Sequence, residues 1–249
     1  MPPPVSHPPD LLRYSHPEWV DTLSRGAGVA YWGLILGALA AAAGELFPHH
    51  LPAIQPYRLA AVAGGLLLLR GVWLLTAHDA GGAAPKNSPL RWGLRLALTA
   101  AVSGGMLKAA VAVGVAGSYA TTFSAAALVA SAADVLGRFA FLRHLRALAL
   151  RVPDPKLAKQ FGPFVPAYGV ALVAAAAVEA LRTLPVVRHL GIASAVAVAV
   201  VTVLLLRHVA RLGRALVIQT DYARGTWAKA NGGGRVGAPP GTQSRTAAA

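Results

Sequence analysis

The chain of 249 residues contains no cysteine, only nine acidic residues and 13% charged residues, whereas about a quarter of a soluble domain is usually charged. The absence of cysteine excludes disulfides, thiol nucleophiles, iron–sulfur clusters, cysteine zinc sites and covalently attached c-type haem. The sequence also lacks a phosphate-binding Walker loop, a nucleophile elbow, a zinc-protease motif and the paired aspartates of lipid headgroup transferases. We therefore predict no catalytic residue, no metal and no cofactor.

What the chain does contain is apolar and basic. Hydrophobic residues make up 55% of it, and 23 lysines and arginines give a formal net charge of +14. Nucleic-acid-binding domains spread such residues over a polar surface, whereas here the cations lie between long apolar runs. We therefore expect a membrane protein with no nucleic-acid partner.

Six apolar segments each approach the ~20 residues that cross ~30 Å of hydrocarbon. They indicate an all-α polytopic bundle of three helical hairpins, which occupies residues 27–211 and is followed by a flexible cytoplasmic tail over 212–249. The predicted spans lie at about 27–47, 57–77, 94–116, 119–138, 164–184 and 187–207.

Residues 1–26 are predicted to form an N-terminal tail. Ser15 and Glu18 have the spacing of a capping box. Residues 16–25 then form either a short amphipathic helix that Trp19 anchors at the membrane interface, or an ordered lead-in to the first span.

The distribution of cations predicts the orientation. With the N-terminus in the cytoplasm, 18 of the 23 cations fall on the cytoplasmic side, three fall outside and two lie within spans. Cytoplasmic loops of membrane proteins carry the excess of lysine and arginine. We therefore predict six transmembrane helices with both termini cytoplasmic, in a bacterial inner membrane.

Four ionisable residues are predicted to lie inside the bilayer: Arg70, Lys108, Asp134 and Glu179. At ~1.5 Å per residue, Arg70 matches Asp134 in depth and Lys108 matches Glu179. They form either buried pairs that set helix register or a polar path for an anion or protons. Double glycines precede both cations, and helix breaks there would favour transport.

Small residues recur every four positions in the first span, at Gly33, Gly37 and Ala41. Such a face suits close helix–helix contact. We expect it to serve packing within the chain, with a homo-oligomer as the alternative.

Residues 138–161 alternate apolar and basic side chains, and they continue the fourth span as an amphipathic helix that ends at Pro153. Asp154 is predicted to cap a following helix. Such a segment would bury its apolar side at the inner interface and hold its cations against anionic headgroups, or it would merely fix orientation. The predicted headgroup contacts are Arg138, Arg143, Arg146, Arg151, Lys156 and Lys159.

Residues 142–159, which run from Leu-Arg-His-Leu-Arg through Val-Pro-Asp-Pro to Leu-Ala-Lys, resemble a stretch in uncharacterised multi-pass inner-membrane proteins of planctomycete-type bacteria. The resemblance implies a multi-pass fold and assigns no activity. From the residues themselves we predict a non-catalytic accessory or scaffold protein with a basic cytoplasmic face that contacts anionic lipid or a protein partner. The alternatives are a small transporter or channel for an anion or protons that uses Arg70 and Lys108, and a lipid-modifying enzyme.

Overall fold

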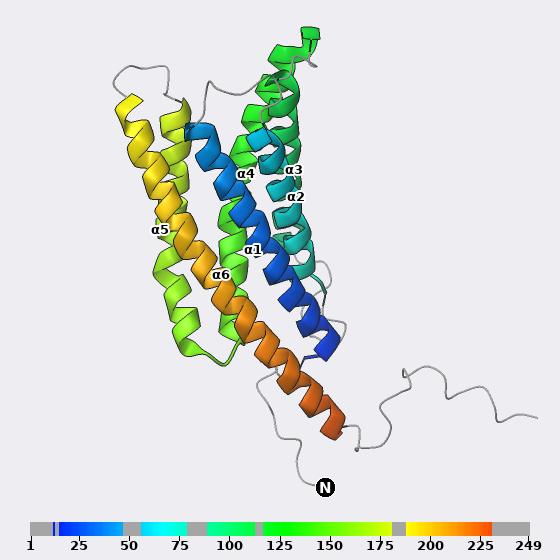
Figure 1. The fold of residues 1–249 in the computed structure, drawn as a ribbon. Coiled ribbons are helices and arrows are strands. Elements are labelled where there is room, and N and C mark those ends of the chain that lie inside the picture. The colour runs from blue at the N-terminus through cyan, green and yellow to red at the C-terminus, as the bar shows by residue number, and fades with distance from the viewer. Residues whose placement is uncertain are drawn as a thin grey trace, which may run out of the picture.

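A computed structural model describes residues 12, 15–46, 56–78, 89–112, 117–180 and 188–230. This part of the chain is all-helical, as predicted, and contains no strand. A 3₁₀ turn, Gly117–Tyr119, precedes α4 (Figure 1). The long helices are α1 (Pro17–Leu46), α2 (Pro56–Leu75), α3 (Pro89–Ala112), α4 (Ala120–Arg151), α5 (Pro155–Ala180) and α6 (Arg188–Ala230).

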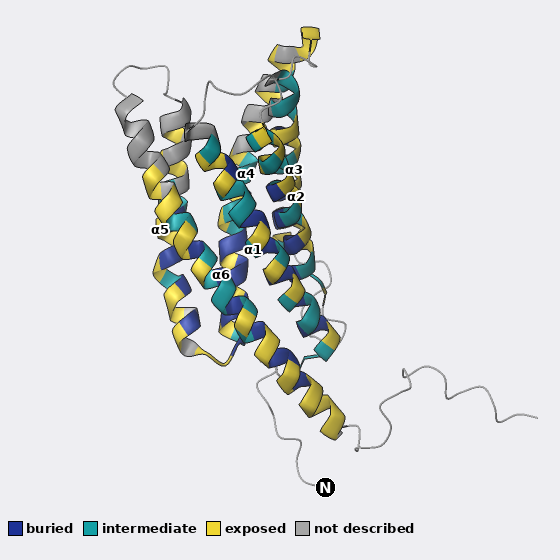
Figure 2. Cartoon of the chain, in the orientation of Figure 1, coloured by how far each residue is buried: buried dark blue, intermediate teal, exposed yellow. Residues whose placement is uncertain are grey.

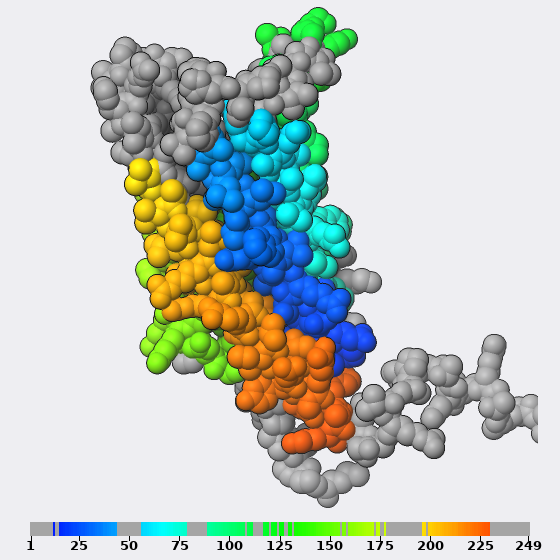
Figure 3. Space-filling view, in the orientation of Figure 1, coloured from blue at the N-terminus to red at the C-terminus, as the bar shows by residue number. Residues whose placement is uncertain are grey.

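The helices run alternately up and down, and each packs against the next one in sequence. The last helix closes this arrangement because α6 packs along α1, which is plain in the space-filling view (Figure 3). We call the end that holds the start of α1 and the α4–α5 turn the basal end, and the opposite end, near Gly117, the apical end.

Prolines begin several of the helices. Pro17, Pro56, Pro89 and Pro155 are the first residues of α1, α2, α3 and α5, where the missing N–H costs nothing and the fixed φ suits a helix. Asp154 caps α5 as predicted, because its Oδ1 accepts the N–H groups of Lys156 (3.0 Å) and Leu157 (3.3 Å). The predicted end of α4 before Pro153 is also confirmed.

The buried core is concentrated toward the basal end (Figure 2). Large side chains from α4, α5 and α6 meet there with almost no exposed surface, among them Phe141, Leu145, Phe161 and Leu212. These residues of α4 and α5 belong to the segment whose apolar side was predicted to enter lipid. That prediction is wrong for them, because the neighbouring helices of the chain bury this side instead.

Two predicted boundaries are also corrected. Residues 17–25 are the first turns of α1, so the separate interfacial helix is wrong and the lead-in is confirmed. α6 continues to Ala230, so residues 212–230 are not a flexible tail, while 231–249 lie outside the described residues. Trp227 near the end of α6 donates its indole N–H to the carbonyl of Ser15 (3.1 Å), which ties this end to the start of α1.

Glycines bring the backbones of α1 and α2 into contact. A Cβ added at Gly33 would lie 2.5 Å from the backbone nitrogen of Leu68, and one at Gly71 would lie 2.5 Å from that of Ala30. A Cβ at Gly64 would lie 2.7 Å from the nitrogen of Gly37. The predicted use of Gly33 and Gly37 within the chain is therefore confirmed, whereas Ala41 is exposed.

Three helices in the described part of the chain are long and apolar enough to cross a membrane: Pro17–Ala43 in α1, all of α2, and Pro89–Val111 in α3. The chain thus has the composition of a membrane protein. α2 and α3 run without interruption through their double glycines, so the helix breaks considered above are absent there.

Candidate functional site

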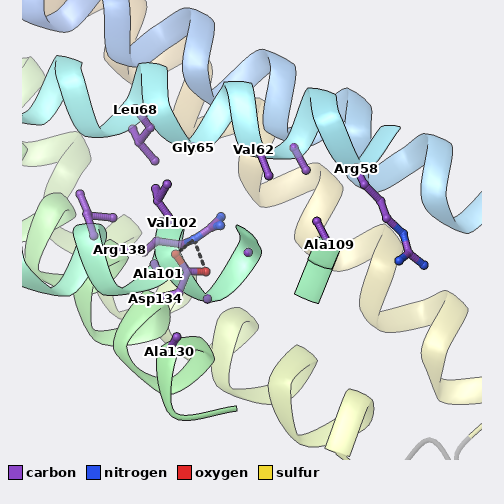
Figure 4. Close-up of a pocket in the computed structure, with 14 residues that line it drawn as sticks. Arg58, Val62, Gly65, Leu68, Ala101, Val102, Ala109, Ala130, Asp134 and Arg138 are labelled. Carbon is purple, nitrogen blue, oxygen red and sulfur yellow. Dashed lines mark hydrogen bonds and ion pairs between the residues drawn. The ribbon is translucent and has the colours of Figure 1, made fainter. Parts of the chain in front are cut away.

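A cavity of about 590 Å³ lies between α2, α3 and α4 (Figure 4). Its wall is mainly small and apolar, because one face of each helix carries alanine, glycine, valine or leucine there. Polar side chains enter at two places: Arg58, near the start of α2, and the pair Asp134 and Arg138 on α4. The other lining residues are Ala61, Val62, Gly65, Leu68, Leu98, Ala101, Val102, Gly104, Gly105, Ala109 and Ala130.

The glycines on this wall keep the cavity open. A Cβ at Gly105 would meet nothing within 4 Å, and one at Gly65 would meet only a methyl group of Val102 at 3.2 Å. Gly65 and Gly105 therefore make space between the helices, and neither double glycine breaks its helix.

Asp134 and Arg138 form an ion pair one helical turn apart. Arg138 donates its Nε–H to both carboxylate oxygens, at 3.0 Å to Oδ1 and 2.9 Å to Oδ2 (Figure 4). Their side chains remain 30% and 37% exposed. The pair is therefore formed within α4, and it presents part of its surface to the cavity that it lines.

The guanidinium of Arg138 has more donors than this pair uses. Arginine carries five N–H donors, and Asp134 takes the one on Nε. The hydroxyl of Tyr168, which is buried on α5, is a second hydrogen-bond partner of Arg138. These two partners leave further Nη–H donors of the guanidinium unused in the described part of the chain, on a side chain that lines the cavity.

The pair lies well inside the helical bundle. His144, six residues further along α4, meets the carbonyl of Leu75, the last residue of α2. Since α2 is itself a candidate span, Arg138 lies about 9 Å apical to the basal end of that span at ~1.5 Å per residue.

Below the cavity, three side chains hold the C-terminal end of α2. The last carbonyls of a helix have no partner within the helix. Here His144 from α4 meets the carbonyl of Leu75 at 3.0 Å, and Trp19 from α1 donates to that of Ala77 at 2.9 Å. Arg95 from α3 donates to the carbonyls of Thr76 (3.0 Å) and Trp73 (3.3 Å).

Arg95 is the most extensively bonded of these three. Its Nε also donates to the Thr76 hydroxyl at 2.8 Å, and its guanidinium lies 4.2 Å from the ring centroid of Trp73. A cation at a helix C-terminus is stabilised by the helix dipole, and a ring face adds cation–π attraction. Arg95 thereby joins α3 to the end of α2.

His144 lies beyond the predicted span 119–138 and is buried. Its pKa is lowered, chiefly by burial and further by the positive charges of Arg91 and Arg95, against the opposing effect of the Leu75 carbonyl. The imidazole is therefore neutral and donates its Nε2–H to that carbonyl. Arg91 adds a second cation beside it, and its Nη1 is buried with no hydrogen-bond partner in the described part of the chain.

The predicted intramembrane residues are not brought together as expected. Asp134 pairs with Arg138, so the predicted Arg70–Asp134 pair is wrong. Arg70 is exposed on α2 and is not among the residues that line the cavity. The side chains of Lys108 and Glu179 lie outside the described residues, so their pairing stays a prediction.

The predicted headgroup contacts divide into two groups. Arg143, Arg146, Lys156 and Lys159 are exposed around the α4–α5 turn. Arg151 lies with its guanidinium 5.0 Å from the ring centroid of Trp19, and Arg138 lines the cavity. Arg138 therefore lies with the cavity and apart from the exposed cations of the turn, and its predicted headgroup contact stays a prediction.

Several residues of this region were not identified from the sequence. Trp19 was predicted to anchor a helix at the membrane interface or to lie in a lead-in to the first span, and Arg95 and His144 were not singled out. The available signal for Arg95 was its place early in α3, six residues after Pro89, close in sequence to Trp73 near the end of α2. Trp19, Arg95 and His144 bond to backbone carbonyl groups, and every residue has one, so the sequence does not indicate which carbonyl each side chain meets.

No family model matches the chain, and neither the curated proteins nor the solved structures contain a match. The resemblance of residues 142–159 therefore stays a prediction, and the function is argued from the site alone.

Proposed function

We propose that the chain is a six-span inner-membrane protein with both termini in the cytoplasm, and that it is a non-catalytic accessory or scaffold protein whose basal face contacts anionic lipid headgroups. The span count draws on the exposed apolar side chains of α4, α5 and α6, such as Leu136 (68%), Val170 (70%) and Val203 (64%). Contiguous apolar surface of this kind marks contact with lipid or protein. These helices lie alongside α1, α2 and α3. This arrangement favours a single bilayer that all six helices cross.

The exposed cations at the α4–α5 turn are the observation that carries the proposed headgroup contact. Leu142, Leu145 and Leu148 are buried on the same helix as exposed Arg143 and Arg146. The apolar side therefore fixes the helix against the core, and the cations project from a rigid support. At the same turn Lys156 and Lys159 are exposed as well, while Asp154 is engaged as the cap of α5.

Each cation close to an anionic surface contributes about 1 kcal/mol. Replacing Arg143, Arg146, Lys156 and Lys159 by glutamine should therefore lower the enrichment of anionic lipid around the full-length protein by at least tenfold. Spin-labelled phosphatidylglycerol and phosphatidylcholine in proteoliposomes measure this enrichment, and added salt should weaken it in the wild type. The matched control is Arg58→Gln, at the apical end. Equal enrichment in both variants, or no effect of salt, would contradict the proposal.

The absence of cysteine makes the topology directly testable. Single cysteines at Ser118, Lys156 and Thr226 would lie in the α3–α4 turn, at the start of α5 and near the end of α6. In intact cells an impermeant maleimide should label Ser118→Cys, and it should label Lys156→Cys and Thr226→Cys only after permeabilisation. Labelling of Ser118 and Lys156 from the same side would rule out that α4 crosses the bilayer.

A transporter or channel for an anion or protons is the second candidate function, and the cavity favours it over the lipid-modifying enzyme. The polar residues on that path would be Asp134 and Arg138 rather than Arg70, since only the former line the cavity. Proteoliposomes that show ion or proton flux, which the Gly105→Leu variant abolishes, would establish this alternative in place of the scaffold.

A further inference from the structure

We propose that the cavity between α2, α3 and α4 binds a membrane-soluble molecule with a linear apolar body and an uncharged carbonyl-type acceptor at one end. The acceptor group would receive hydrogen bonds from the Nη–H donors of Arg138. This binding site is independent of the proposed headgroup contacts at the α4–α5 turn.

The shape and lining of the cavity suit an aliphatic chain. Its lining on α2 runs from Arg58 to Leu68, ten residues or about 15 Å along the axis, and between these ends the wall is alanine, valine and glycine. A cavity of about 590 Å³ would hold about 20 waters at ~30 Å³ each, and every buried water needs two to four polar partners. Water would find hydrogen-bond partners on only a small part of this mainly apolar wall, so an apolar occupant is favoured over water.

The Asp134–Arg138 ion pair determines which kind of polar group the ligand can carry at its end. Asp134 already neutralises Arg138, so a second anion at the same place would be repelled by the carboxylate. The remaining Nη–H groups nevertheless favour a neutral acceptor, because a hydrogen bond from a charged donor is stronger than one from a neutral donor. An uncharged carbonyl, such as that of an ester or a quinone, meets both conditions.

Binding can be measured by native mass spectrometry and thermal shift on the full-length protein in maltoside detergent. The probes are methyl palmitate and decylubiquinone, which carry carbonyls, hexadecane, which has no acceptor, and palmitate, which has an anionic head. A hydrogen bond to a charged donor should make the carbonyl probes bind at least tenfold more tightly than hexadecane. Whichever carbonyl probe binds better identifies the source as an ester lipid or a quinone.

Two sets of variants locate the binding. Gly105→Leu should fill the cavity and abolish binding, since an added Cβ meets nothing within 4 Å, and Gly93→Leu on the same helix is the matched control because it also has open space but does not line the cavity. The double variant Asp134→Leu with Arg138→Met replaces the pair by apolar residues, a change that is often neutral or stabilising for a buried ion pair. It should keep hexadecane binding and lose the preference for carbonyls.

Four results would overturn the proposal. These are equal binding of all probes, tighter binding of palmitate than of its methyl ester, a carbonyl preference that survives in the double variant, and no binding of any probe. Tight carbonyl binding that Gly105→Leu removes and Gly93→Leu retains would support it.

Discussion

α2 packs against its neighbours in opposite ways on two of its faces. Toward α1 the backbones touch, and a Cβ at Gly64 would lie 2.7 Å from the nitrogen of Gly37. Toward α3 and α4 the same helix faces a cavity, and the adjacent Gly65 lines it. Glycine in one helix thus serves close packing on one face and open space on the next, and only the neighbouring helix distinguishes the two uses.

The largest effect is expected at the close contact between the backbones of α1 and α2, which we call the close seam. Gly33→Ala would place a Cβ 2.5 Å from the backbone of Leu68, and overpacking of this kind costs about 3 kcal/mol because backbone cannot move aside as a side chain can. Gly37→Ala, one turn later, has no atom within 4 Å of its Cβ and should gain about 0.5–1 kcal/mol from helix propensity. Denaturation of both variants in detergent measures the difference. Equal stability of the two would show that α1 and α2 are not in backbone contact.

The next effect concerns the basal end, where side chains hold α2 in place. Arg95→Met should lower the free energy of unfolding by about 2 kcal/mol, because it removes bonds from a charged donor to Thr76 and Trp73 and leaves carbonyls unpaired. Arg91→Met is the matched control one turn away, since its Nη1 has no hydrogen-bond partner in the described part of the chain. It should be neutral or stabilising. A larger loss for Arg91→Met than for Arg95→Met would refute the role of Arg95.

A smaller effect is expected on acidification. His144 is buried and its pKa is lowered in the folded protein. In the unfolded chain the same imidazole has the ordinary histidine pKa of about 6.5. As the pH falls below that pKa, the unfolded chain takes up a proton that the folded protein does not. The free energy of unfolding should therefore keep its full value above about pH 6.5 and fall progressively below that pH. Melting temperatures at pH 7.5 and pH 5.5 measure the loss, which should be smaller in His144→Gln because glutamine keeps a donor and does not titrate. An equal loss in both proteins would assign the acid sensitivity to other groups.

The smallest effect is expected at the open seam, the face of α2 that borders the cavity toward α3 and α4. Gly65→Ala adds a Cβ 3.2 Å from a methyl group of Val102, and that side chain borders a cavity into which it can move. The change in unfolding free energy should stay within about 0.5 kcal/mol, because the gain in helix propensity offsets the contact. Gly64→Ala, at the neighbouring position, should cost about 2 kcal/mol. Similar losses of unfolding free energy at both positions would show that the open seam is packed as tightly as the close seam.

Much of the helix pattern was predictable because it depends on local chemistry. The apolar runs and the Asp154 cap act over a few residues, so the sequence located these features closely. The pairing of charges was not predictable in the same way. Arg70 and Asp134 matched in depth, yet Asp134 pairs with Arg138 one turn away on its own helix, because depth does not state which faces of two helices meet.

The same limit applies to the basic segment after residue 138. Its alternation of apolar and basic residues correctly indicated an amphipathic helix, but it did not state whether lipid or protein would cover the apolar side. In the structure Phe141, Leu145 and Leu148 are covered by neighbouring helices.

The sequence by itself determined that this is an all-helical chain with the composition of a membrane protein and a strong excess of cations, because hydropathy, helix propensity and charge are properties of the residues. Only the tertiary structure decided which glycines close a seam and which open a cavity, and that Trp19, Arg95 and His144 meet at the end of α2. These outcomes depend on the relative rotation of helices about their axes, which packing between distant segments sets.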